Sequence, residues 1–267
     1  MEDFAGSVPQ LYESHLVPIL FAPYARDLAD RLARRAPSRV LEIACGTGVV
    51  TRELASRLPE GAAIVATDRS RPMLDQAAAI PIARPVEWRE ADAMRLPFDD
   101  ARFDAVVCQF GVMFFPDQAK AFAEARRVLR AGGVYLFSVW DRIADNELAE
   151  TVQSALAPLF PGDPPRFMER TPHGYHDRTV LEADLRAGGF RVADVEIATL
   201  ALRSRARSAR DAAVAFCQGT PLRDELVARD PSRIDEATGA AEEAIARRFG
   251  RGEVDAKMQA HVVAAAR

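Results

Sequence analysis

Two glycines and two carboxylates have the spacing expected of a site for a nucleoside-containing ligand. Glu42 lies in the hydrophobic run "VLEIACGTGVV" (40–50), which breaks into a turn containing Gly46 and Gly48. Asp68 ends the next hydrophobic run, about 20 residues beyond Gly48. Glycine lets a ligand touch the backbone, because a Cβ atom there would collide with it. A carboxylate at the position of Asp68 can accept hydrogen bonds from both hydroxyls of a ribose.

Glu42 separates two classes of ribose-containing ligand. A dinucleotide fold holds a pyrophosphate at a helix N-terminus, where a nearby carboxylate would repel it. The turn reads "ACGTG" from Ala44 and lacks the spacing GxGxxG. S-adenosylmethionine has a ribose, no phosphate, and two cationic groups, a sulfonium and an α-ammonium. The residues therefore favour S-adenosylmethionine over NAD, and a nicotinamide-dependent oxidoreductase is kept as an alternative.

The elements that position these residues follow an alternating pattern between 39 and 140. Short apolar runs alternate with amphipathic segments, which is typical of a parallel sheet covered by helices on both faces. We expect strands at 39–44, 62–67, 85–89, 103–110 and 133–139, and helices at 48–58, 70–79 and 117–130. Gly132-Gly133 is expected to end the last helix. In such a sheet the ligand lies beyond the carboxyl ends of the strands.

The segments on either side of this pattern are less regular. Ser7 and Pro9 are expected to begin an N-terminal helix on which Tyr12 and His15 share a face. After residue 140 the sequence predicts a cap formed by 141–190 and 204–250, with helices over 208–249. Two further strands are expected at 190–203 and 257–264. We assign 141–267 to cap insertions and the final two strands of the same domain.

Composition excludes several classes of function. The net charge of −4 argues against general binding to nucleic-acid phosphates. No apolar run is long enough for a membrane span, and the first thirty residues lack a signal-peptide pattern. Three widely spaced cysteines fit reduced thiols rather than a disulfide framework or a zinc site. We therefore expect a soluble cytoplasmic protein without a metal, membrane insertion or a nucleic-acid partner.

Several motifs in order resemble those of class I S-adenosylmethionine-dependent methyltransferases. They are "VLEIACGTG", "VATDRSRPMLDQA", "READAMRLPFDDARFDAVVCQFGVMFFPD" and "EARRVLRAGGVYLFSVW", which lie between residues 39 and 140. The resemblance is nearest to the small-molecule group that includes the ubiquinone/menaquinone-biosynthesis methyltransferases. It implies a Rossmann-like α/β fold: a seven-stranded, mostly parallel sheet with an antiparallel last strand, plus a small helical cap. It also implies that helices in 1–38 cover the cofactor site and that 39–140 form the cofactor-binding core.

The resemblance implies a cofactor role for a set of residues along the carboxyl edge of the sheet. The set is Glu42, Ala44, Gly46, Gly48, Asp68, Arg69, Met73, Asp92, Ala93, Gln109 and Phe110. The glycine turn would pack on the methionine and ribose, with Glu42 acting on the ammonium through backbone or water. Asp68 would bind the ribose diol, and Ala93 would offer its amide beside Asp92 at the adenine. Ala44 stands where the family has a glycine. Its methyl group should be tolerated if φ is negative there.

Each of these assignments has a structural alternative. Met73, expected on the adenine face, could be ordinary core. Asp68 could cap the following helix, and Asp92 could be a turn residue. Gln109, expected with Phe110 to line the passage from the sulfonium to the acceptor, could be a polar residue at a strand end.

Methyl transfer from a sulfonium needs alignment and a dry pocket more than a dedicated base. A base helps when the acceptor is a hydroxyl or an activated carbon, and the candidates are His173, His176 and His15. Structural roles are open for all three, and His176 beside Asp177 could cap a helix. Tyr12, Met113, Trp140 and Tyr175 are candidate substrate residues. The basic run 203–210 could bind an anionic substrate tail or be a solvated connection.

The sequence as a whole predicts a methyltransferase acting on a small apolar or aromatic metabolite by direct displacement. Oxygen or carbon is the expected accepting atom, with nitrogen as a third option, and S-adenosyl-L-homocysteine is the product. Enzymes that methylate the amino groups of bases carry Asn/Asp-Pro-Pro-aromatic where this chain has "CQFG" (108–111). The alternatives are a cofactor-binding protein without transferase activity and the NAD-dependent oxidoreductase. The protein is expected to be a monomer or a homodimer.

Overall fold

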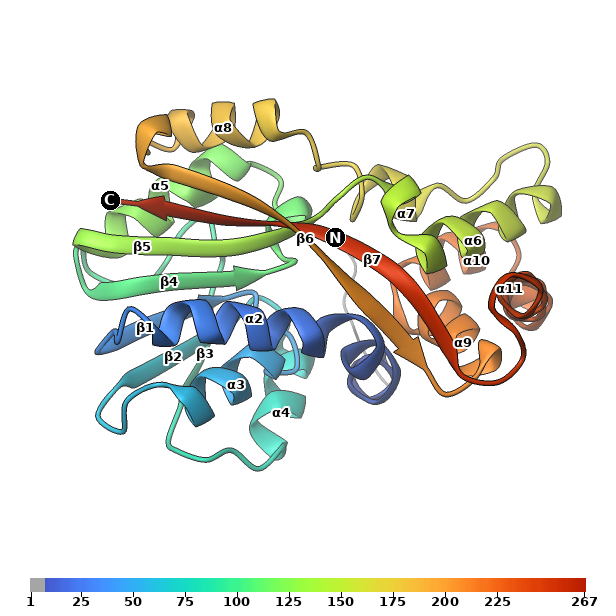
Figure 1. The fold of residues 1–267 in the computed structure, drawn as a ribbon, viewed down its shortest axis with the longest axis horizontal. Coiled ribbons are helices and arrows are strands. Elements are labelled where there is room, and N and C mark those ends of the chain that lie inside the picture. The colour runs from blue at the N-terminus through green and yellow to red at the C-terminus, as the bar shows by residue number, and fades with distance from the viewer. Residues whose placement is uncertain (1–7) are drawn as a thin grey trace. The chain divides into compact units, whose positions relative to one another are not determined.

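A seven-stranded sheet is the central element of the computed structural model, which describes residues 8–267 (Figure 1). The strands are β1 (Arg39–Ile43), β2 (Ala63–Asp68), β3 (Glu87–Glu90), β4 (Phe103–Gln109), β5 (Leu129–Trp140), β6 (Val195–Ala206) and β7 (Val254–Ala266). Their order in the sheet is β3-β2-β1-β4-β5-β7-β6. Strands β1 to β5 are parallel, and β7 runs antiparallel to β5. The predicted fold class is confirmed.

The strand order reverses between β1 and β4, which are neighbours in the sheet but not in sequence. In an open α/β sheet, ligands bind beyond the carboxyl ends of the strands at this reversal. Glu42 of β1 is in register with Val107 of β4 and with Ala66 of β2. The predicted glycine turn follows β1 directly, so the topology places it at the reversal.

Helices connect these strands and fill most of the remaining chain. The α-helices are α1 (Val8–Leu11), α2 (Ala22–Ala33), α3 (Val49–Arg57), α4 (Arg71–Ala79), α5 (Gln118–Val128), α6 (Glu147–Leu156), α7 (Phe167–Arg170), α8 (Arg178–Ala187), α9 (Ala209–Gly219), α10 (Leu222–Arg229) and α11 (Ile234–Phe249). A π-helix, η1, spans Tyr12–Phe21. Short 3₁₀ turns are η2 (Val112–Phe114), η3 (Ile143–Asp145), η4 (Ala157–Leu159), η5 (Val192–Asp194) and η6 (Pro231–Arg233). None of the helices within residues 8–267 is both long and apolar enough to cross a bilayer.

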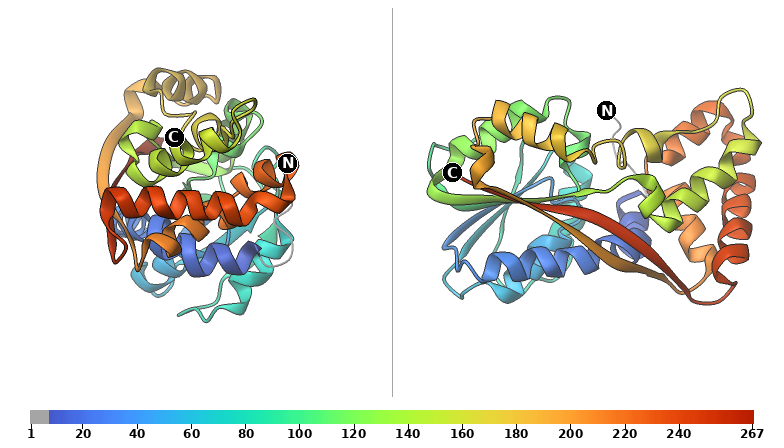
Figure 2. Two further views of the ribbon diagram at one scale, coloured as in Figure 1. Left: turned by 90° about the vertical axis from the view of Figure 1, so that its right-hand side faces the viewer. Right: turned by 45° about the horizontal axis from the view of Figure 1, so that its top comes forward.

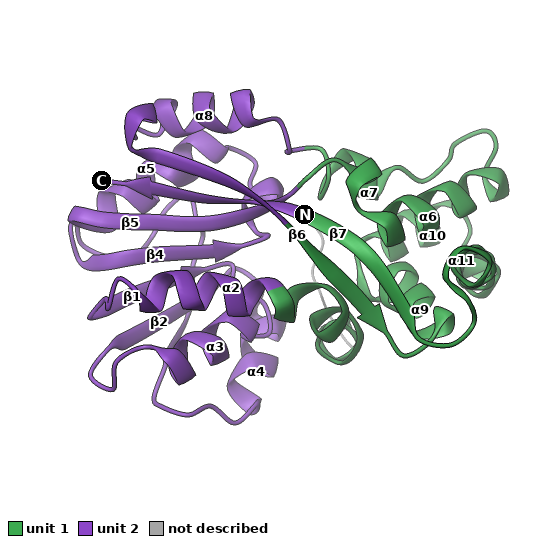
Figure 3. Cartoon of the chain, in the orientation of Figure 1, with its two compact units in different colours: residues 1–23, 141–174, 201–259 green, residues 24–140, 175–200, 260–267 purple. Residues whose placement is uncertain are grey.

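The chain divides into two compact units, coloured separately in Figure 3. The helical unit comprises residues 1–23, 141–174 and 201–259, and the sheet unit comprises 24–140, 175–200 and 260–267. Strands β6 and β7 pass from one unit into the other. Every residue predicted to bind the cofactor belongs to the sheet unit.

The sheet unit is a three-layer structure. On one face, Leu28 and Leu32 of α2 and Leu54 of α3 pack with Val107 of β4 in one buried cluster. Leu136 of β5 belongs to the same cluster. Because side chains alternate along a strand, the residues next to Leu136 face the other side of the sheet. There the Phe137 ring lies 5.4 Å from the Phe122 ring of α5. The predicted covering of both sheet faces by helices is present in this unit.

The start of β5 differs from the prediction that Gly132-Gly133 ends a helix. Helix α5 ends at Val128, and both glycines lie inside β5. The pairing of β4 with β5 shifts register between Phe103 and Ala105, so the glycine segment has no regular partners. Gly132 has φ +75°, which glycine adopts without strain. The predicted helix end was wrong because these glycines make an irregularity in a strand, a role that glycine also fills.

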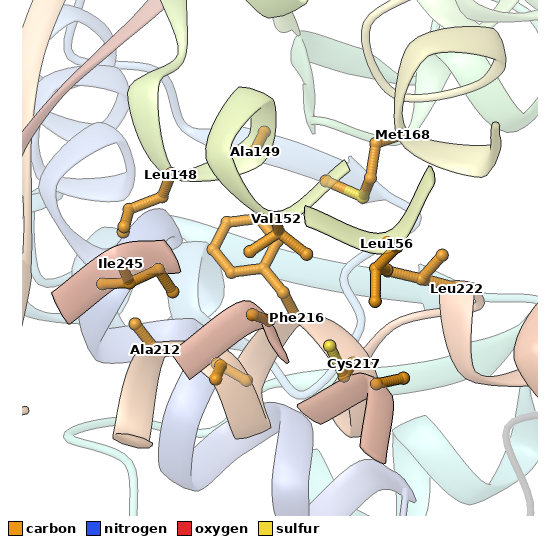
Figure 4. Close-up of a cluster of buried hydrophobic side chains, with 14 of the residues drawn as sticks. Leu148, Ala149, Val152, Leu156, Met168, Ala212, Phe216, Cys217, Leu222 and Ile245 are labelled. Carbon is orange, nitrogen blue, oxygen red and sulfur yellow. The ribbon is translucent and has the colours of Figure 1, made fainter. Parts of the chain in front are cut away.

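The helical unit has its own core, shown in Figure 4. Val152 of α6, Phe216 of α9 and Ile245 of α11 are fully buried within it. The long helix α11 packs against both α6 and α9, as Figure 2 shows on its left. These contacts bury one stripe of each helix, which is the pattern expected of amphipathic helices. The prediction of helices over 208–249 agrees with α9, α10 and α11.

The N-terminal segment corrects a second prediction. Residues 12–21 form a π-helix, in which the hydrogen bonds run to the fifth residue and the turns are wider. In an α-helix, Tyr12 and His15 would share a face because they are three residues apart. The wider turns of the π-helix place them on different faces. Tyr12 instead stacks on Phe21 at 5.1 Å, roughly two turns away in such a helix. Ser7, the predicted start, lies outside the described residues.

Candidate functional site

The turn after β1 is built from two glycines in the left-handed region. Gly46 has φ +55° and Gly48 has φ +82°, conformations that are strained for residues with a Cβ atom. The Gly46 amide donates to Asp68 Oδ2 at 2.8 Å, and the Gly48 amide donates to the carbonyl of Cys45 at 2.9 Å. Asp68, at the end of β2, thus fixes the turn at the end of β1. The motif that contains the glycines and the motif that contains Asp68 are therefore joined by a hydrogen bond.

Trp88 of β3 lies under this turn, which sequence reasoning missed. A Cβ atom on Gly48 would be 3.0 Å from the Trp88 ring and 3.2 Å from the Ala77 side chain. Gly48 therefore lets β3 and α4 approach the turn closely, and its role includes packing as well as ligand access. The available signal was the position of Trp88, a large aromatic residue four residues before Asp92.

Ala44 lies in the left-handed region with φ +54°, so the condition for tolerating its methyl group is not met. The expectation of a negative φ was wrong. Alanine in this conformation places its Cβ atom too close to the following carbonyl oxygen, at a cost of roughly 1–2 kcal/mol. The strain lies at the carboxyl end of β1, directly before the glycine turn.

Glu42 is buried in β1 and holds its carboxyl group against α3. The Thr51 hydroxyl donates to Glu42 Oε2 at 2.6 Å, and Glu42 is only 1% exposed. Burial raises the pKa of Glu42 to about 8, while the hydrogen bond from Thr51 and the positive charge of Arg52 act to lower it. A carboxyl group in this state gains from the approach of a cation, because the cation favours the charged form.

Asp68 combines a structural role with room for a ligand. In addition to the Gly46 amide, it accepts from the Ser70 amide at 2.8 Å through Oδ1. Burial raises the pKa of Asp68, although the backbone amides of Ser70, Gly46 and Arg69 act in the opposite direction. A carboxylate offers about four lone-pair sites, so sites remain for a ribose diol. The helix-cap alternative is therefore compatible with the ribose role.

Asp92 has the geometry of a turn residue and Met73 that of a core residue, which are their structural alternatives. Asp92 Oδ1 accepts from the Met94 amide at 2.9 Å, which makes a turn after β3. Met73 is buried on the inner face of α4, beside Leu74. Ala93 is buried next to Asp92. Their adenine roles stay predictions, since a carboxylate that closes a turn keeps acceptor capacity.

An aromatic cluster follows the ends of β4 and β5. Phe110 stacks on Trp140 with ring centroids 3.8 Å apart and planes 3° apart, and Tyr24 of α2 meets both rings edge-on. The Tyr24 hydroxyl donates to the carbonyl of Leu200 at 3.0 Å. Phe110 has φ +51°, a strained conformation that the stacked rings retain. Gln109 ends β4 just before this residue.

Comparisons with known proteins agree with this geometry. Residues 41–137 match the family model described as a methyltransferase domain. A demethylmenaquinone methyltransferase of Thermus thermophilus is 44% identical over 112 residues, covering 41% of this chain and 50% of that protein. A malonyl-[acyl-carrier protein] O-methyltransferase of Geobacter sulfurreducens is 34% identical over 161 residues, covering 60% of this chain and 58% of that protein. The chain thus spans about half the length of these relatives.

A solved structure shares the fold over most of the chain. It is phosphoethanolamine N-methyltransferase 2 of Haemonchus contortus, with a TM-score of 0.56 and 17% identity, covering 97% of this chain and 56% of that one. The segment 41–137 is thus similar in sequence to methyltransferase domains. The resemblance to the menaquinone-biosynthesis methyltransferases is confirmed by the Thermus relative.

Two buried hydroxyl groups test whether the methyltransferase domain fits its family's cofactor. Thr47 Oγ1 and Ser70 Oγ are buried and have no hydrogen-bond partner among the described residues. Thr47 lies between the two glycines, and Ser70 follows Asp68 by two residues. Buried polar groups without partners are rare in native proteins and each calls for an explanation. A polar ligand at the turn would supply partners, so these residues fit the cofactor.

The predicted substrate residues near the ends of β4 and β5 are packed. Met113 and Trp140 are each 6% exposed, and Trp140 is engaged by Phe110. The next residue of the same 3₁₀ turn, Phe114, is 42% exposed and was missed. Which residue of the apolar run "VMFF" (112–115) is exposed cannot be assigned from sequence before the turn type is known. Phe114 joins Met113 and Trp140 as a substrate candidate.

The catalytic candidates lie outside the methyltransferase domain. His173 is buried in the helical unit, and its Nδ1 lies 2.8 Å from the carbonyl oxygen of Asp141. A carbonyl only accepts, so the neutral ring carries its proton on Nδ1 and its lone pair on Nε2. His15 Nδ1 lies 2.8 Å from the Ser14 hydroxyl, which can donate or accept. His173 therefore has the better-defined tautomer.

The segment 175–178 is tied to α8. The Tyr175 hydroxyl donates to Asp184 Oδ2 at 2.6 Å. Asp177, next to His176, caps α8 by accepting from the Thr179 amide at 2.8 Å. The capping residue is thus the aspartate rather than His176, and both predicted roles for Tyr175 and His176 stay predictions.

The basic run 203–210 is engaged in ion pairs within the helical unit. Arg203 and Arg205 pair with Asp255, and Arg207 pairs with Asp211. Exposed pairs of this kind contribute little free energy. Their geometry favours the solvated connection over an anionic tail site. Within residues 8–267, no group of three His, Cys, Asp or Glu side chains could hold a metal ion.

Proposed function

We propose that the protein is an S-adenosylmethionine-dependent methyltransferase that transfers a methyl group to a small apolar or aromatic metabolite by direct displacement. The observation that carries this proposal is the pair of carboxyl groups on either side of the glycine turn, buried Glu42 and half-buried Asp68. A ligand with a cationic end and a ribose satisfies both. A pyrophosphate beside Glu42 would be repelled.

S-adenosylmethionine, when bound, supplies a methyl group on a sulfonium, and the C–S bond breaks as the acceptor's electron pair takes the methyl group. The residues of this chain hold and align the reactants. Asp68 binds the ribose hydroxyls, and Glu42 stabilises the ammonium through neighbouring backbone or water. The apolar side chains after β4 exclude water, which strengthens every polar interaction at the site.

The acceptor is proposed from chemistry rather than from the relatives, because their names specify different acceptors. Phe114 is exposed after β4, and Phe110 and Trp140 form a buried aromatic stack at the ends of β4 and β5. Aromatic side chains at these positions suit an apolar or aromatic molecule. Oxygen and carbon are the proposed accepting atoms, with nitrogen as a third option. His173 is the proposed base for acceptors that must lose a proton.

Calorimetric titration tests the cofactor. We expect S-adenosylhomocysteine to bind and NAD not to bind. Asp68→Asn should weaken S-adenosylhomocysteine at least about fivefold, the scale of a lost hydrogen bond. Asp75→Asn is the matched control, since Asp75 is an exposed partner of Arg71 on α4. Binding of NAD in place of S-adenosylhomocysteine would reject the proposal.

A screen of acceptors tests the activity. Phenols, quinone precursors, fatty acids and amines are offered with S-adenosylmethionine, and release of S-adenosylhomocysteine is measured. A labelled methyl group identifies the accepting atom. Cofactor binding without turnover of any class would favour the alternative, a binding protein without transferase activity.

A further inference from the structure

Arg52 of α3 reaches back to the glycine turn. Its Nη1 donates to the carbonyl oxygen of Thr47 at 2.6 Å. Thr47 stands between Gly46 and Gly48, both in the left-handed region. The turn is otherwise held on its amide side, where Gly46 is bonded to Asp68 and Gly48 to Cys45. The Arg52 bond is a constraint on the carbonyl side.

The position of Arg52 breaks a local rule of helix electrostatics. It is the fourth residue of α3, and no acidic residue occurs in the first turn of that helix. A cation near a helix N-terminus opposes the macrodipole and destabilises the helix. Violations of local rules are expected at functional sites, where another interaction compensates. The bond to the Thr47 carbonyl provides that compensation.

The groups that act electrostatically on Glu42 come from the turn and three further elements. They are the thiols of Cys45 and Cys108, the hydroxyl of Thr51, the carboxyl of Asp68 and the guanidinium of Arg52. Burial raises the pKa of both thiols, so they are uncharged at neutral pH. Asp68 opposes ionisation of Glu42, and Arg52 favours it.

We infer that Arg52 is a positioning residue for the cofactor: it fixes the glycine turn through its hydrogen bond to the Thr47 carbonyl. The ligand in this inference rests on the proposed function. The effect of Arg52 on the shape of the turn does not depend on that function. Without Arg52, the turn would open more often, and Glu42 would hold its proton to a higher pH. Cofactor affinity would fall, and its dependence on pH would shift upward.

Three variants separate these effects. Arg52→Met removes both the donor and the charge, whereas Arg52→Lys keeps the charge and changes the donor geometry. Arg57→Met is the matched control, because Arg57 lies on the same helix but pairs with Asp30 and Glu53. All three are measured beside the wild-type protein.

Hydrogen exchange of the Gly46 and Gly48 amides tests the turn in the ligand-free protein. We expect exchange about tenfold faster in Arg52→Met, the factor that corresponds to a lost hydrogen bond to a charged group. Arg57→Met should match the wild type at these amides. Equal exchange in Arg52→Met and wild type would overturn the inference whether or not the cofactor is the one proposed.

Titration with S-adenosylhomocysteine between pH 6 and 9 tests the charge. We expect the affinity to rise at a higher pH in Arg52→Met than in the wild type. In Arg52→Lys and Arg57→Met it should rise at the same pH as in the wild type. Loss of affinity by the same factor at every pH would mean a structural role only and would overturn the inference. Failure of the wild type to bind would reject the proposed function instead, and the exchange experiment would still decide the role of Arg52 in the turn.

Discussion

The Cβ atom of Ala44 lies 2.7 Å from the position that a Cβ atom on Gly111 would occupy. Ala44 follows β1 and Gly111 follows β4, so the contact joins the two strands between which the sheet order reverses. The Cys108 sulfur lies 2.8 Å from the same position. The methyl group of Ala44 thus fills space that only a glycine at 111 leaves open, and the two residues depend on each other.

Gly111→Ala should lower the free energy of unfolding by about 1–3 kcal/mol, the range for overpacking. The cost is steric, because Gly111 has φ −98°, which alanine adopts freely. Adding Ala44→Gly removes one of the two close contacts and should restore part of the loss. Urea unfolding of the two single variants and the double variant gives the coupling energy. Additive effects of the two substitutions would contradict the direct contact.

Ala44→Gly alone should change stability by less than about 1 kcal/mol, because the strain it relieves is offset by a more flexible unfolded chain. The control is Ala123→Gly, at an exposed position within α5, which should cost about 1 kcal/mol. A similar loss in both variants would mean that Ala44 is not strained.

The sheet unit was predictable because most of its strands and helices are short and regular and alternate along the chain. Glu42, Gly46, Gly48 and Asp68 could be assigned together, since each follows from its place at a strand end. The φ angle of Ala44 could not, because alanine avoids the left-handed region unless tertiary contacts impose it. Arg52 was missed for a similar reason: its partner is a backbone carbonyl, which no side-chain pattern marks.

The helical unit was predicted only as a partial cap. Its segments come from three separate parts of the chain, and their helices share one core. Amphipathic periodicity identifies each helix but not the partner that covers its apolar face. The π-helix was missed because sequence patterns assume α-helical spacing, and Tyr12 and His15 were wrongly expected to share a helix face as a result.

Glu42 should make the stability of the protein depend on pH. Its pKa rises from 4.5 to about 8 on folding, so the folded state binds the proton more tightly. The stabilisation is fully present below pH 4.5 and is lost as the pH rises to 8, by about 1.4 kcal/mol per pH unit. Glutamine does not titrate, so Glu42→Gln does not lose stability in this way as the pH rises. Its free energy of unfolding, measured in urea from pH 5 to 8, should therefore increase relative to the wild type.

Thr51→Val provides a second arm of the same experiment. It removes the hydrogen bond that favours the charged form of Glu42, so the loss of stability should continue to a higher pH. Other ionisable groups are common to all three proteins and cancel in the differences. A constant difference between Glu42→Gln and wild type at every pH would show that Glu42 does not change its pKa on folding.

Gly48 and Gly239 should respond in opposite directions to the same substitution. Gly48→Ala meets the Trp88 ring at 3.0 Å and a φ of +82°, so we expect a loss of roughly 2 kcal/mol or more. Gly239 lies within α11, and a Cβ atom there would have no described neighbour within 4 Å. Gly239→Ala should raise the free energy of unfolding by about 0.4–1 kcal/mol, because alanine restricts the unfolded chain.

Trp88 reports on the first of these changes directly. The chain has two tryptophans, Trp88 and Trp140, so a Trp140→Phe background isolates the emission of Trp88. In that background, Gly48→Ala should shift the emission because the new methyl group displaces the ring, whereas Gly239→Ala should leave it unchanged. Unchanged emission together with unchanged stability in Gly48→Ala would contradict the close packing of β3 beneath the glycine turn.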